Sequence, residues 1–456
     1  MKFKILHTND IHSNYENFAK IKTLINLNKD ENTIILDAGD FADFKRVELM
    51  GTKGKLAGQL LEKAGYDAIT IGNNETFQGI KMLESMTNLS PIPFLSCNLL
   101  KSGKPLNDVN PFIFLIKQNV RFLIIGTSPN IPIFNELMGF SFIDYREEIT
   151  KIIQENKHDV CILVNHIGTK NDELLANSID GIDIIISSHD HKLYPEAKII
   201  NGVINHSAGQ YGENLGVIEF ELQDNKLSLS NSKVISTNTI QKDTGIIKIL
   251  AENKIEAINY LSQALYPLNQ TLYHDYLEEC PIGNLLADSL RDLLKCDIGL
   301  INSGIINGGI KKGFVTDLKL IEIAPSPLNA TSFEVKGKDI KAALQISLDP
   351  QNCLHNGKGP GFRGIALGRL HVSGMTIIYK NQTINKILIG NEELNEEKYY
   401  TVGSSDYLQR NQVYTPLNNN INPNYHVEYI RDVLKIYLPK QEFVDNAFIN
   451  RWISEN

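Results

Sequence analysis

Five apolar runs in the first part of the chain each end in side chains of the kind that bind metal ions. These side chains are, in chain order, Asp10 with His12, Asp40, Asn73, His166, and His189 with His191. Continuously apolar runs are typical of strands that are buried on both faces of a sheet. Ligands of such sheets collect in the loops beyond the strand ends. The sequence therefore predicts one pocket lined with carboxylates, an amide and imidazoles.

The segments between these runs have the spacing of amphipathic helices. The apolar residues of 54–65 fall near one face of a helix, and Gly65 can end it. Segments 145–157 and 168–178 have the same character. Strands that alternate with helices are typical of a layered α/β domain. We therefore expect an α/β fold for the first half of the chain.

The length of 456 residues exceeds what one ordinary hydrophobic core accommodates, so we expect two domains. The apolar residues of 244–264 lie near one face of a predicted helix. Further along, a helix over 282–294 is followed by short strands and glycine-rich loops. We therefore predict a first domain over 1–240, a linker helix within 241–268, and a smaller α+β domain over 269–456.

The composition disfavours several classes of protein. A formal net charge of -8 and a pI near 5.8 do not suit a protein that binds nucleic-acid polymers or anionic membranes, because phosphate contacts need a basic face. None of the five cysteines forms a CxxC pair, which argues against a disulfide framework. The chain contains no apolar run of about 18 residues. A candidate ligand as early as Asp10 leaves no room for a signal peptide, so we expect a cytoplasmic protein.

Taken together, the motifs resemble those of the calcineurin-like metallophosphoesterases, and the whole chain resembles the 5′-nucleotidase family within them. The motifs that carry the resemblance are Asp10-Ile11-His12, Asp37-Ala38-Gly39-Asp40, Gly72-Asn73-Asn74-Glu75, Asn165-His166 and His189-Asp190-His191. The second half resembles the C-terminal domain of that family more loosely, through Glu279-Cys280-Pro281 and Ile301-Asn302-Ser303-Gly304. The resemblance implies a sandwich of two mixed sheets flanked by helices, followed by a substrate-specificity domain.

The resemblance also implies two divalent metal ions. One would be held by Asp10, His12, Asp40 and His191, and the other by Asp40, Asn73, His166 and His189, with Asp40 as the bridge. A lone DxH or HxH motif is more often structural, but the ordered set favours a dinuclear site. Oxygen and nitrogen ligands without thiolates suit Mn²⁺, Zn²⁺, Fe²⁺ or Co²⁺. Such a site lowers the pKa of a bound water and hydrolyses a phosphate ester or anhydride.

The chain departs from the family at the residues that move protons. The family motif GNHE is Gly72-Asn73-Asn74-Glu75 here, so Asn74 stands at the position of the catalytic His. The aspartate that orients this His is Phe77. Because an amide cannot carry a proton, the loss should cost about 10²–10⁴-fold for poor leaving groups. Glu75 is a candidate substitute donor, with a supporting role as the alternative.

The family's nucleotide pocket also differs. Its arginines fall at Glu278 and Asn307, and its first base-stacking Phe falls at Ser326, whereas Asn302 and the second aromatic, Tyr407, are retained. Replacing an arginine by a glutamate reverses the charge that a phosphate would meet. Three cations that flank the second glycine-rich loop could compensate, namely Lys358, Arg363 and Arg369, but we expect a solvated surface position for them.

We therefore interpret Asn302, Tyr407 and Arg363 as candidate substrate contacts, although Tyr407 could equally pack in a core. His206 follows another strand near the metal loops and is either a supporting residue or a structural histidine. The sequence favours a metal-dependent phosphoesterase that acts on a small, nucleotide-like phosphate ester. The alternative is a metal-containing nucleotide-binding or regulatory protein that has lost catalysis.

Overall fold

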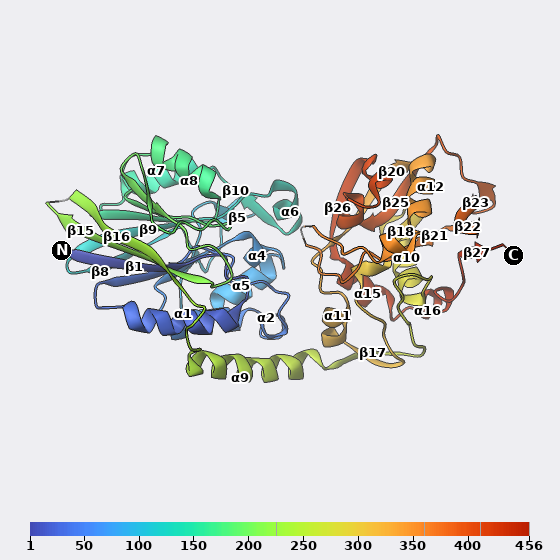
Figure 1. Ribbon diagram of the computed structural model, residues 1–456, viewed down its shortest axis with the longest axis horizontal. Helices are drawn as coiled ribbons and strands as arrows, with labels where there is room; N and C mark the ends of the chain where they lie inside the picture. Colours follow the sequence, from blue (N-terminus) through green and yellow to red (C-terminus); the bar gives the residue numbers. More distant parts are fainter. Residues whose placement is uncertain (225, 360, 411, 456) are drawn as a thin grey trace. The chain divides into compact units, whose positions relative to one another are not determined.

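The computed structural model describes residues 1–224, 226–359, 361–410 and 412–455. It divides into two compact units, Met1–Tyr260 and Leu261–Asn456 (Figure 1). Each unit has its own sheets and its own buried core. The two units are therefore described separately.

Two large sheets form the centre of the first unit. The seven-stranded sheet has the order β16 (Lys226–Ser236), β15 (Asn214–Gln223), β1 (Lys2–Thr8), β2 (Thr33–Asp37), β3 (Ala68–Thr70), β4 (Phe94–Leu95), β7 (Val109–Asn110). The six-stranded sheet has the order β13 (Lys198–Ile200), β14 (Val203–His206), β12 (Ile184–Ile186), β11 (Val160–Asn165), β9 (Val120–Thr127), β8 (Phe112–Lys117). A small third sheet contains β10 (Phe140–Phe142), β5 (Leu99–Lys101) and β6 (Lys104–Pro105).

Both faces of the central strands are buried, as the apolar runs predict. In β11, Val160 and Ile162 contribute to a core shared with β1 and β2 of the other sheet, while Cys161 and Leu163 point to the opposite face. That opposite face packs against α7 (Tyr145–Glu155) and α8 (Thr169–Ser178), and α1 (Tyr15–Asn28) lies on the far side of the other sheet (Figure 1). The layers are thus helix, sheet, sheet and helix, and the predicted α/β sandwich is confirmed.

The parallel strands of each sheet end at the same edge. Strands β1, β2 and β3 run parallel, with Thr8 opposite Asp37 and Asp37 opposite Ile69. Strands β11 and β12 are also parallel, with Val164 opposite Ile186. The loops that follow these five strands carry all seven predicted metal ligands. The topology therefore gathers these loops at the carboxyl ends of the strands.

Short helices complete the first unit, and its last helix is the predicted linker. The short helices are α2 (Val47–Gly51), α3 (Lys55–Ala64), α4 (Asn73–Thr76), α5 (Ile80–Asn88) and α6 (Pro132–Leu137). Helix α9 (Thr244–Leu261) packs on α3, where Lys55 pairs with Glu256 at 2.6 Å and Asn253 donates to Gln59 Oε1 at 2.8 Å. Its described contacts therefore attach α9 to the first unit.

The second unit is an α+β arrangement of two main sheets. One sheet has the order β21 (Leu370–Ser373), β18 (Ile298–Asn302), β25 (Tyr399–Ser405), β20 (Asn329–Lys336), β26 (Ile421–Tyr429). The other has the order β24 (Glu392–Glu393), β23 (Thr383–Ile389), β22 (Met375–Lys380), β27 (Trp452–Ser454), and β17 (Ala264–Leu268) pairs with β19 (Gly313–Thr316). The helices are α10 (Pro281–Leu294), α11 (Asp317–Ile323), α12 (Gly337–Ile346), α13 (Pro350–Cys353), α14 (Asp406–Gln409), α15 (Ile430–Tyr437) and α16 (Gln441–Asn446).

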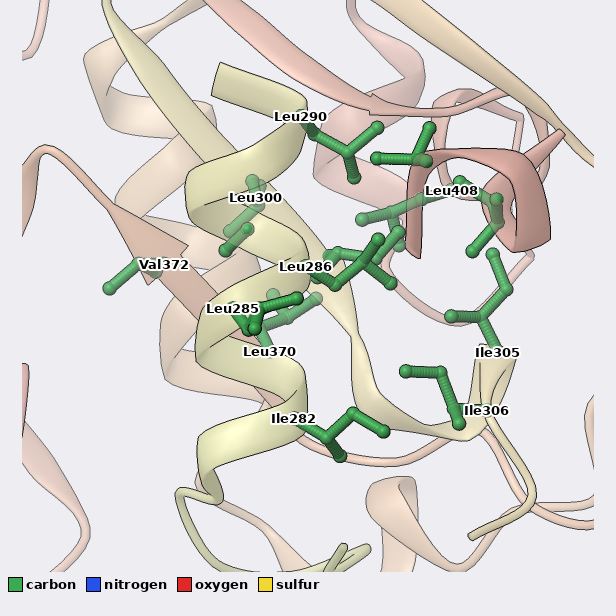
Figure 2. Close-up of a cluster of buried hydrophobic side chains, with 14 of the residues drawn as sticks. Ile282, Leu285, Leu286, Leu290, Leu300, Ile305, Ile306, Leu370, Val372 and Leu408 are labelled. Carbon is green, nitrogen blue, oxygen red and sulfur yellow. The ribbon is translucent and has the colours of Figure 1, made fainter. Parts of the chain in front are cut away.

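Helix α10 forms the centre of the second core. Its apolar face, which includes Leu286 and Leu290, packs among side chains of β18, β21 and α14 (Figure 2). The helix and the sheet approach closely at Gly299, where a Cβ atom would collide with the carbonyl oxygen of Ala287. A glycine at this strand position is therefore a packing requirement. Among the helices that the structure describes, none combines the length and apolar character needed to cross a bilayer.

Candidate metal centre

The strand-end loops bring five of the seven predicted ligands into two overlapping groups. The groups are Asp10 with His12 and His191, and Asp10 with Asp40 and His166. Within each group, one ligand atom from every residue lies within 4.8 Å of the others. Asp10, Asp40 and His166 are almost completely buried, whereas His12 and His191 reach the surface. The site is thus a cluster in which two carboxylates are buried and two histidines reach the surface.

The donor atoms of the first group converge at distances that suit one ion. His12 Nε2 and His191 Nε2 lie 3.0 Å apart, and His191 Nε2 lies 3.4 Å from Asp10 Oδ1. Donors that surround a tetrahedral ion at about 2.0–2.1 Å are about 3.3 Å from one another. The three side chains can therefore bind a single divalent cation without rearrangement of the backbone.

The second group shares its carboxylates with the first. His166 Nε2 lies 3.2 Å from Asp40 Oδ2 and 3.9 Å from Asp10 Oδ1. Asp40 Oδ2 also lies 3.8 Å from His12 Nε2. Asp40 Oδ2 thus faces a histidine of each group, and Asp10 Oδ1 is common to both groups. Either carboxylate is close enough to connect two cations.

Of the two remaining predicted ligands, Asn73 and His189, the structure places His189 beside the second group. Asn73 is the first residue of α4, and its side-chain oxygen is buried without a hydrogen-bond partner among the described residues. The ring of His189 lies 5.0 Å from the ring of His166, and the His189 backbone N–H donates to Asp10 Oδ2 at 3.1 Å. The structure therefore brings six of the seven predicted residues into one cluster, and Asn73 precedes Asn74, whose side chain contacts Asp40.

Buried lone pairs in the pocket fit bound cations. Asp10 Oδ1, Asn73 Oδ1 and His166 Nε2 are buried and have no hydrogen-bond partner among the described residues. His166 Nδ1 lies 2.7 Å from the carbonyl oxygen of Ala38, to which it donates, so Nε2 is left to bind a ligand. Buried polar atoms are otherwise nearly always paired. These unpaired atoms support the binding of metal ions by this residue set.

Five of the seven predicted metal ligands have strained backbone conformations. The φ angles of Asp10, His12, Asp40, His189 and His191 are 52°, 47°, 54°, 79° and 57°. Positive φ values are uncommon outside glycine and cost about 1–3 kcal/mol each. Such strain persists only where the surrounding structure compensates for it, and it concentrates at functional sites. The backbone thus indicates independently that these loops are built for a ligand.

The charged groups of the pocket shift one another's pKa values. Burial raises the pKa of Asp10 to about 6, against the opposing effect of His166. Burial also raises the pKa of Asp40, but His166 and then His12 lower it further, so it lies below its ordinary value. For His166, burial lowers the pKa, but Asp40 raises it more strongly, to about 10. The carboxylates therefore favour positive charge in the pocket, which suits divalent cations.

Asn74 and Glu75 take different positions at the start of α4. Asn74 Nδ2 donates to Asp40 Oδ2 at 2.6 Å and lies 3.4 Å from His12 Nδ1, so this amide borders the ligand cluster. Glu75 is completely buried, and its carboxylate accepts the backbone N–H groups of Gly72, Asp40 and Ala42 at 2.8, 3.1 and 2.8 Å. Burial, and then the charge of Asp40, raise the pKa of Glu75 to about 7. This geometry favours the supporting role for Glu75, since it ties two ligand loops together.

His206 is a structural histidine in the sheet. His206 Nδ1 lies 2.7 Å from His7 Nε2, and neither residue is exposed. Burial lowers the pKa of His206 to about 4 and that of His7 well below its ordinary value. A Cβ atom on Gly216, in the neighbouring strand β15, would collide with the His7 ring. The pair therefore packs inside the sheet and does not join the ligand cluster.

Two of the three candidate substrate contacts are buried in the second unit. Asn302 is completely buried, and its Nδ2 donates to the carbonyl oxygen of Leu367 at 2.6 Å. Tyr407 is 4% exposed, and its ring stacks on Phe362 with 4.3 Å between centroids and an interplanar angle of 19°. One face of Tyr407 is thus covered by an aromatic ring of the same chain. The structure favours core packing for Tyr407.

Arg363, the third candidate, is exposed and lies beside two positions at which the chain departs from the family pattern. The Arg363 backbone N–H donates to Ser326 Oγ at 2.9 Å, and its carbonyl oxygen accepts from Asn307 Nδ2 at 3.2 Å. The expected surface position of Arg369 is wrong. Arg369 is 4% exposed because it pairs with Glu278 at 3.1 Å and lies over the Trp452 ring, 4.4 Å from the centroid.

Tyr211 also lies at the metal centre, and the sequence pattern did not indicate it. Its ring centroid is 5.5 Å from that of His12 and 6.1 Å from that of His191. The glycines at 209 and 212 indicate a turn here, but they do not indicate where a side chain in that turn will point. Contact with His12, almost 200 residues earlier in the chain, depends on the sheet topology.

Comparisons with known proteins agree with this geometry. Residues 3–193 match the calcineurin-like phosphoesterase family, and residues 258–416 match the 5′-nucleotidase C-terminal domain. The chain is 30% identical over 458 residues to the uncharacterized metallophosphoesterase YunD of Bacillus subtilis, covering 95% of this chain and 98% of YunD. The chain belongs to the 5′-nucleotidase family of calcineurin-like metallophosphoesterases. This metallophosphoesterase is therefore a metal-dependent phosphoester hydrolase.

Other relatives of the metallophosphoesterase extend the comparison. The trifunctional nucleotide phosphoesterase protein YfkN of Bacillus subtilis is 25% identical over 405 residues, which are 75% of this chain and 27% of YfkN. Among solved structures, the NAD nucleotidase of Haemophilus influenzae has a TM-score of 0.66 at 16% identity, covering 100% of this chain and 98% of that chain. The match to this structure shows the fold of the metallophosphoesterase.

Proposed function

We propose that the protein hydrolyses small phosphate esters or anhydrides at a centre of two divalent cations. The observation that carries this proposal is the position of Asp40 Oδ2, 3.2 Å from His166 and 3.8 Å from His12. One carboxylate oxygen that faces two separate histidines can connect two ligand sets. The residues that would hold the ions are Asp10, His12, Asp40, Asn73, His166, His189 and His191.

Two cations bound here would activate a coordinated water and neutralise the oxygens of the phosphoryl group. The protein's own contribution is to hold the ligands in position. Ala38 fixes the orientation of His166 through its carbonyl oxygen. Glu75 holds the Asp40 loop against the start of α4 through three backbone N–H groups. Such supporting contacts typically change metal affinity or activity by about 10–100-fold when they are removed.

The leaving group is the part of the substrate that Asn74 restricts. An amide can donate a hydrogen bond to the departing oxygen but cannot protonate it. Glu75 does not supply the proton in this proposal, because its carboxylate is buried and accepts three backbone N–H groups. Substrates whose leaving groups depart without protonation should therefore react best. Aryl phosphates and the phosphate anhydrides of nucleotides are such substrates.

Nucleotide-like compounds are the proposed substrate class, with anhydrides or diesters favoured over nucleoside monophosphates. Similarity to YfkN, a trifunctional nucleotide phosphoesterase, supports a nucleotide substrate. Exposed Arg363 is the candidate contact for an anionic part of such a substrate. Mn²⁺, Zn²⁺, Fe²⁺ and Co²⁺ all suit the oxygen and nitrogen ligands. A cytoplasmic location stays a prediction.

Kinetics with defined metals test the proposal. The protein, stripped with a chelator and reconstituted with Mn²⁺, is assayed with p-nitrophenyl phosphate and bis(p-nitrophenyl) phosphate. We expect turnover of at least one ester, and its loss in Asp40→Ala. If the wild type and Asp40→Ala hydrolyse the esters at the same rate, the assignment of the metal centre is contradicted. An absence of turnover with both esters and with nucleotide anhydrides would favour the non-catalytic alternative.

A further inference from the structure

The loop between β14 and β15 holds an aromatic side chain at the edge of the metal centre. Asn9 anchors the loop, because its Oδ1 accepts the Ala208 N–H at 2.9 Å and its Nδ2 donates to the Gly209 carbonyl oxygen at 2.6 Å. Hydrogen bonds also hold the backbone N–H and the backbone carbonyl oxygen of Tyr211. Its N–H donates to the Asp10 carbonyl oxygen at 2.7 Å, and its carbonyl oxygen accepts from Asn17 Nδ2 at 3.0 Å.

The backbone of Tyr211 is strained in the same way as that of the ligands. Its φ angle is 55°, and it is the one Phe, Tyr or Trp with positive φ among the residues that the structure describes. For a bulky side chain this conformation is a genuine outlier. A glycine would adopt it freely, as the neighbouring Gly209 and Gly212 do, with φ angles of 88° and 62°. The ring must therefore contribute something that offsets the strain.

The ring lies over the ligands and is also open to solvent. It is tilted by 54° against His12 and by 58° against His191, the two ligands that reach the surface of the pocket. Tyr211 nevertheless remains 38% exposed. A ring that served only to pack against the imidazoles would gain most from full burial. The exposed part leaves aromatic surface open to solvent next to His12 and His191.

We propose that Tyr211 is a specificity-determining residue whose ring contacts the organic group next to the phosphorus of the substrate. The ligand class is an aryl phosphate ester, one of the two substrate types that need no proton donor at the position of Asn74. Aromatic pairs of this kind favour offset or edge contacts and discriminate against small alkyl groups. This inference rests on the proposed function, since the phosphoryl group must first bind at the metal centre.

Binding of two inert phosphonates tests the inference without turnover. Phenylphosphonate carries a ring next to phosphorus, whereas methylphosphonate does not, and both are titrated calorimetrically into Mn²⁺-loaded protein. The variant Tyr211→Asn removes the ring and keeps a residue that tolerates positive φ. We expect it to weaken phenylphosphonate about tenfold and methylphosphonate less than about twofold. Tyr211→Phe should keep phenylphosphonate affinity within about twofold, since the ring makes the contact.

Two controls separate specificity from support of the ligands. Mn²⁺ titration of the Tyr211→Asn protein should give the wild-type affinity. Tyr260→Ala removes a tyrosine of similar exposure, 45%, from helix α9 and should leave both phosphonates unaffected. An equal loss of both phosphonates, or a loss of Mn²⁺ affinity, would overturn the inference and make Tyr211 a packing residue. If wild-type protein binds Mn²⁺ but neither phosphonate, the proposed function itself is contradicted.

Discussion

The predicted metal ligands and the predicted substrate contacts differ in their backbone conformations and in the partners that their side chains have within the chain. In the first unit, five of the seven predicted ligands have positive φ, and Asp10, Asn73 and His166 each have a buried polar atom for which the described part of the chain offers no hydrogen-bond partner. In the second unit, none of Asn302, Arg363 and Tyr407 has positive φ. Tyr407 stacks on Phe362, although Oδ1 of Asn302, like the ligand atoms, has no hydrogen-bond partner within the ranges that the structure describes.

This difference shows how to distinguish a site from a packed region. Converging lone pairs and strained backbone lower the stability of the fold unless a ligand compensates for them. Stacked rings and paired charges stabilise the fold without any ligand. We therefore expect substitutions among the ligands to change activity and those around Tyr407 to change stability.

The largest effect is expected for Asp40→Asn. The variant removes the carboxylate charge between the two ligand groups, so hydrolysis should fall by about 10³-fold or more, equivalent to about 4 kcal/mol of transition-state stabilisation. Steady-state kinetics with p-nitrophenyl phosphate measure this. The matched control is Glu393→Gln in the second unit, whose side chain is 64% exposed and which should change the rate less than about twofold. Similar losses in both variants would remove the distinction between the regions.

The next effect is expected on stability. Tyr407→Ala should lower the free energy of unfolding by about 3 kcal/mol, because it removes a buried ring and leaves a cavity. The double-mutant cycle with Phe362→Ala should give a coupling of about 1 kcal/mol from the stacked pair. Urea denaturation followed by circular dichroism measures both. If Tyr407→Ala keeps wild-type stability but raises the KM for a nucleotide substrate, Tyr407 belongs to a binding site after all.

A proton donor introduced at position 74 tests whether Asn74 is the reason for the expected loss of acid catalysis. Asn74→His should raise the hydrolysis of alkyl phosphate monoesters by up to about 10²-fold, since these leaving groups need a proton. The rate with p-nitrophenyl phosphate should change much less. The ratio of kcat/KM values for the two substrate types measures this selectivity. Unchanged or lower rates with alkyl esters would count against the assignment of Asn74 as the site of lost acid catalysis.

The smallest effect concerns histidines of the same unit that do not bind metal. Burial lowers the pKa of His206 to about 4 from 6.5, so the folded state favours the neutral ring. The contribution of the neutral His206 ring to the free energy of unfolding is present above pH 6.5 and is lost as the pH falls toward 4. For chelator-treated protein, His206→Gln should remove about 2 kcal/mol of the stability difference between pH 7 and pH 5. If His206→Gln leaves the pH dependence of the unfolding free energy unchanged, burial does not lower the pKa of His206 as described.

The sequence predicted the parts of the structure that depend on local pattern. The helix predicted over 54–65 corresponds to α3 (Lys55–Ala64), and the one over 168–178 corresponds to α8 (Thr169–Ser178). The gathering of the candidate ligands was predictable because apolar periodicity locates the strands, and the carboxyl ends of parallel strands meet at one edge.

Residues whose roles depend on distant contacts were not predictable in this way. Arg369 was expected at the surface, but it is buried against Trp452, which lies more than 80 positions away in the chain. The orientation of Tyr211 depends on a backbone torsion and on Asn9, about 200 positions earlier. Neither the torsion nor these pairings are encoded in a local pattern of residue types.

The metal content of the protein tests the central claim most directly. Protein freed of chelator and reconstituted with Mn²⁺ or Zn²⁺ is analysed by elemental mass spectrometry beside Asp40→Ala and the control Glu393→Gln. We predict about two equivalents per chain for the wild type and the control, and about one or fewer for Asp40→Ala. Less than one equivalent in the reconstituted wild type, or equal occupancy in Asp40→Ala, would contradict a dinuclear centre connected through Asp40.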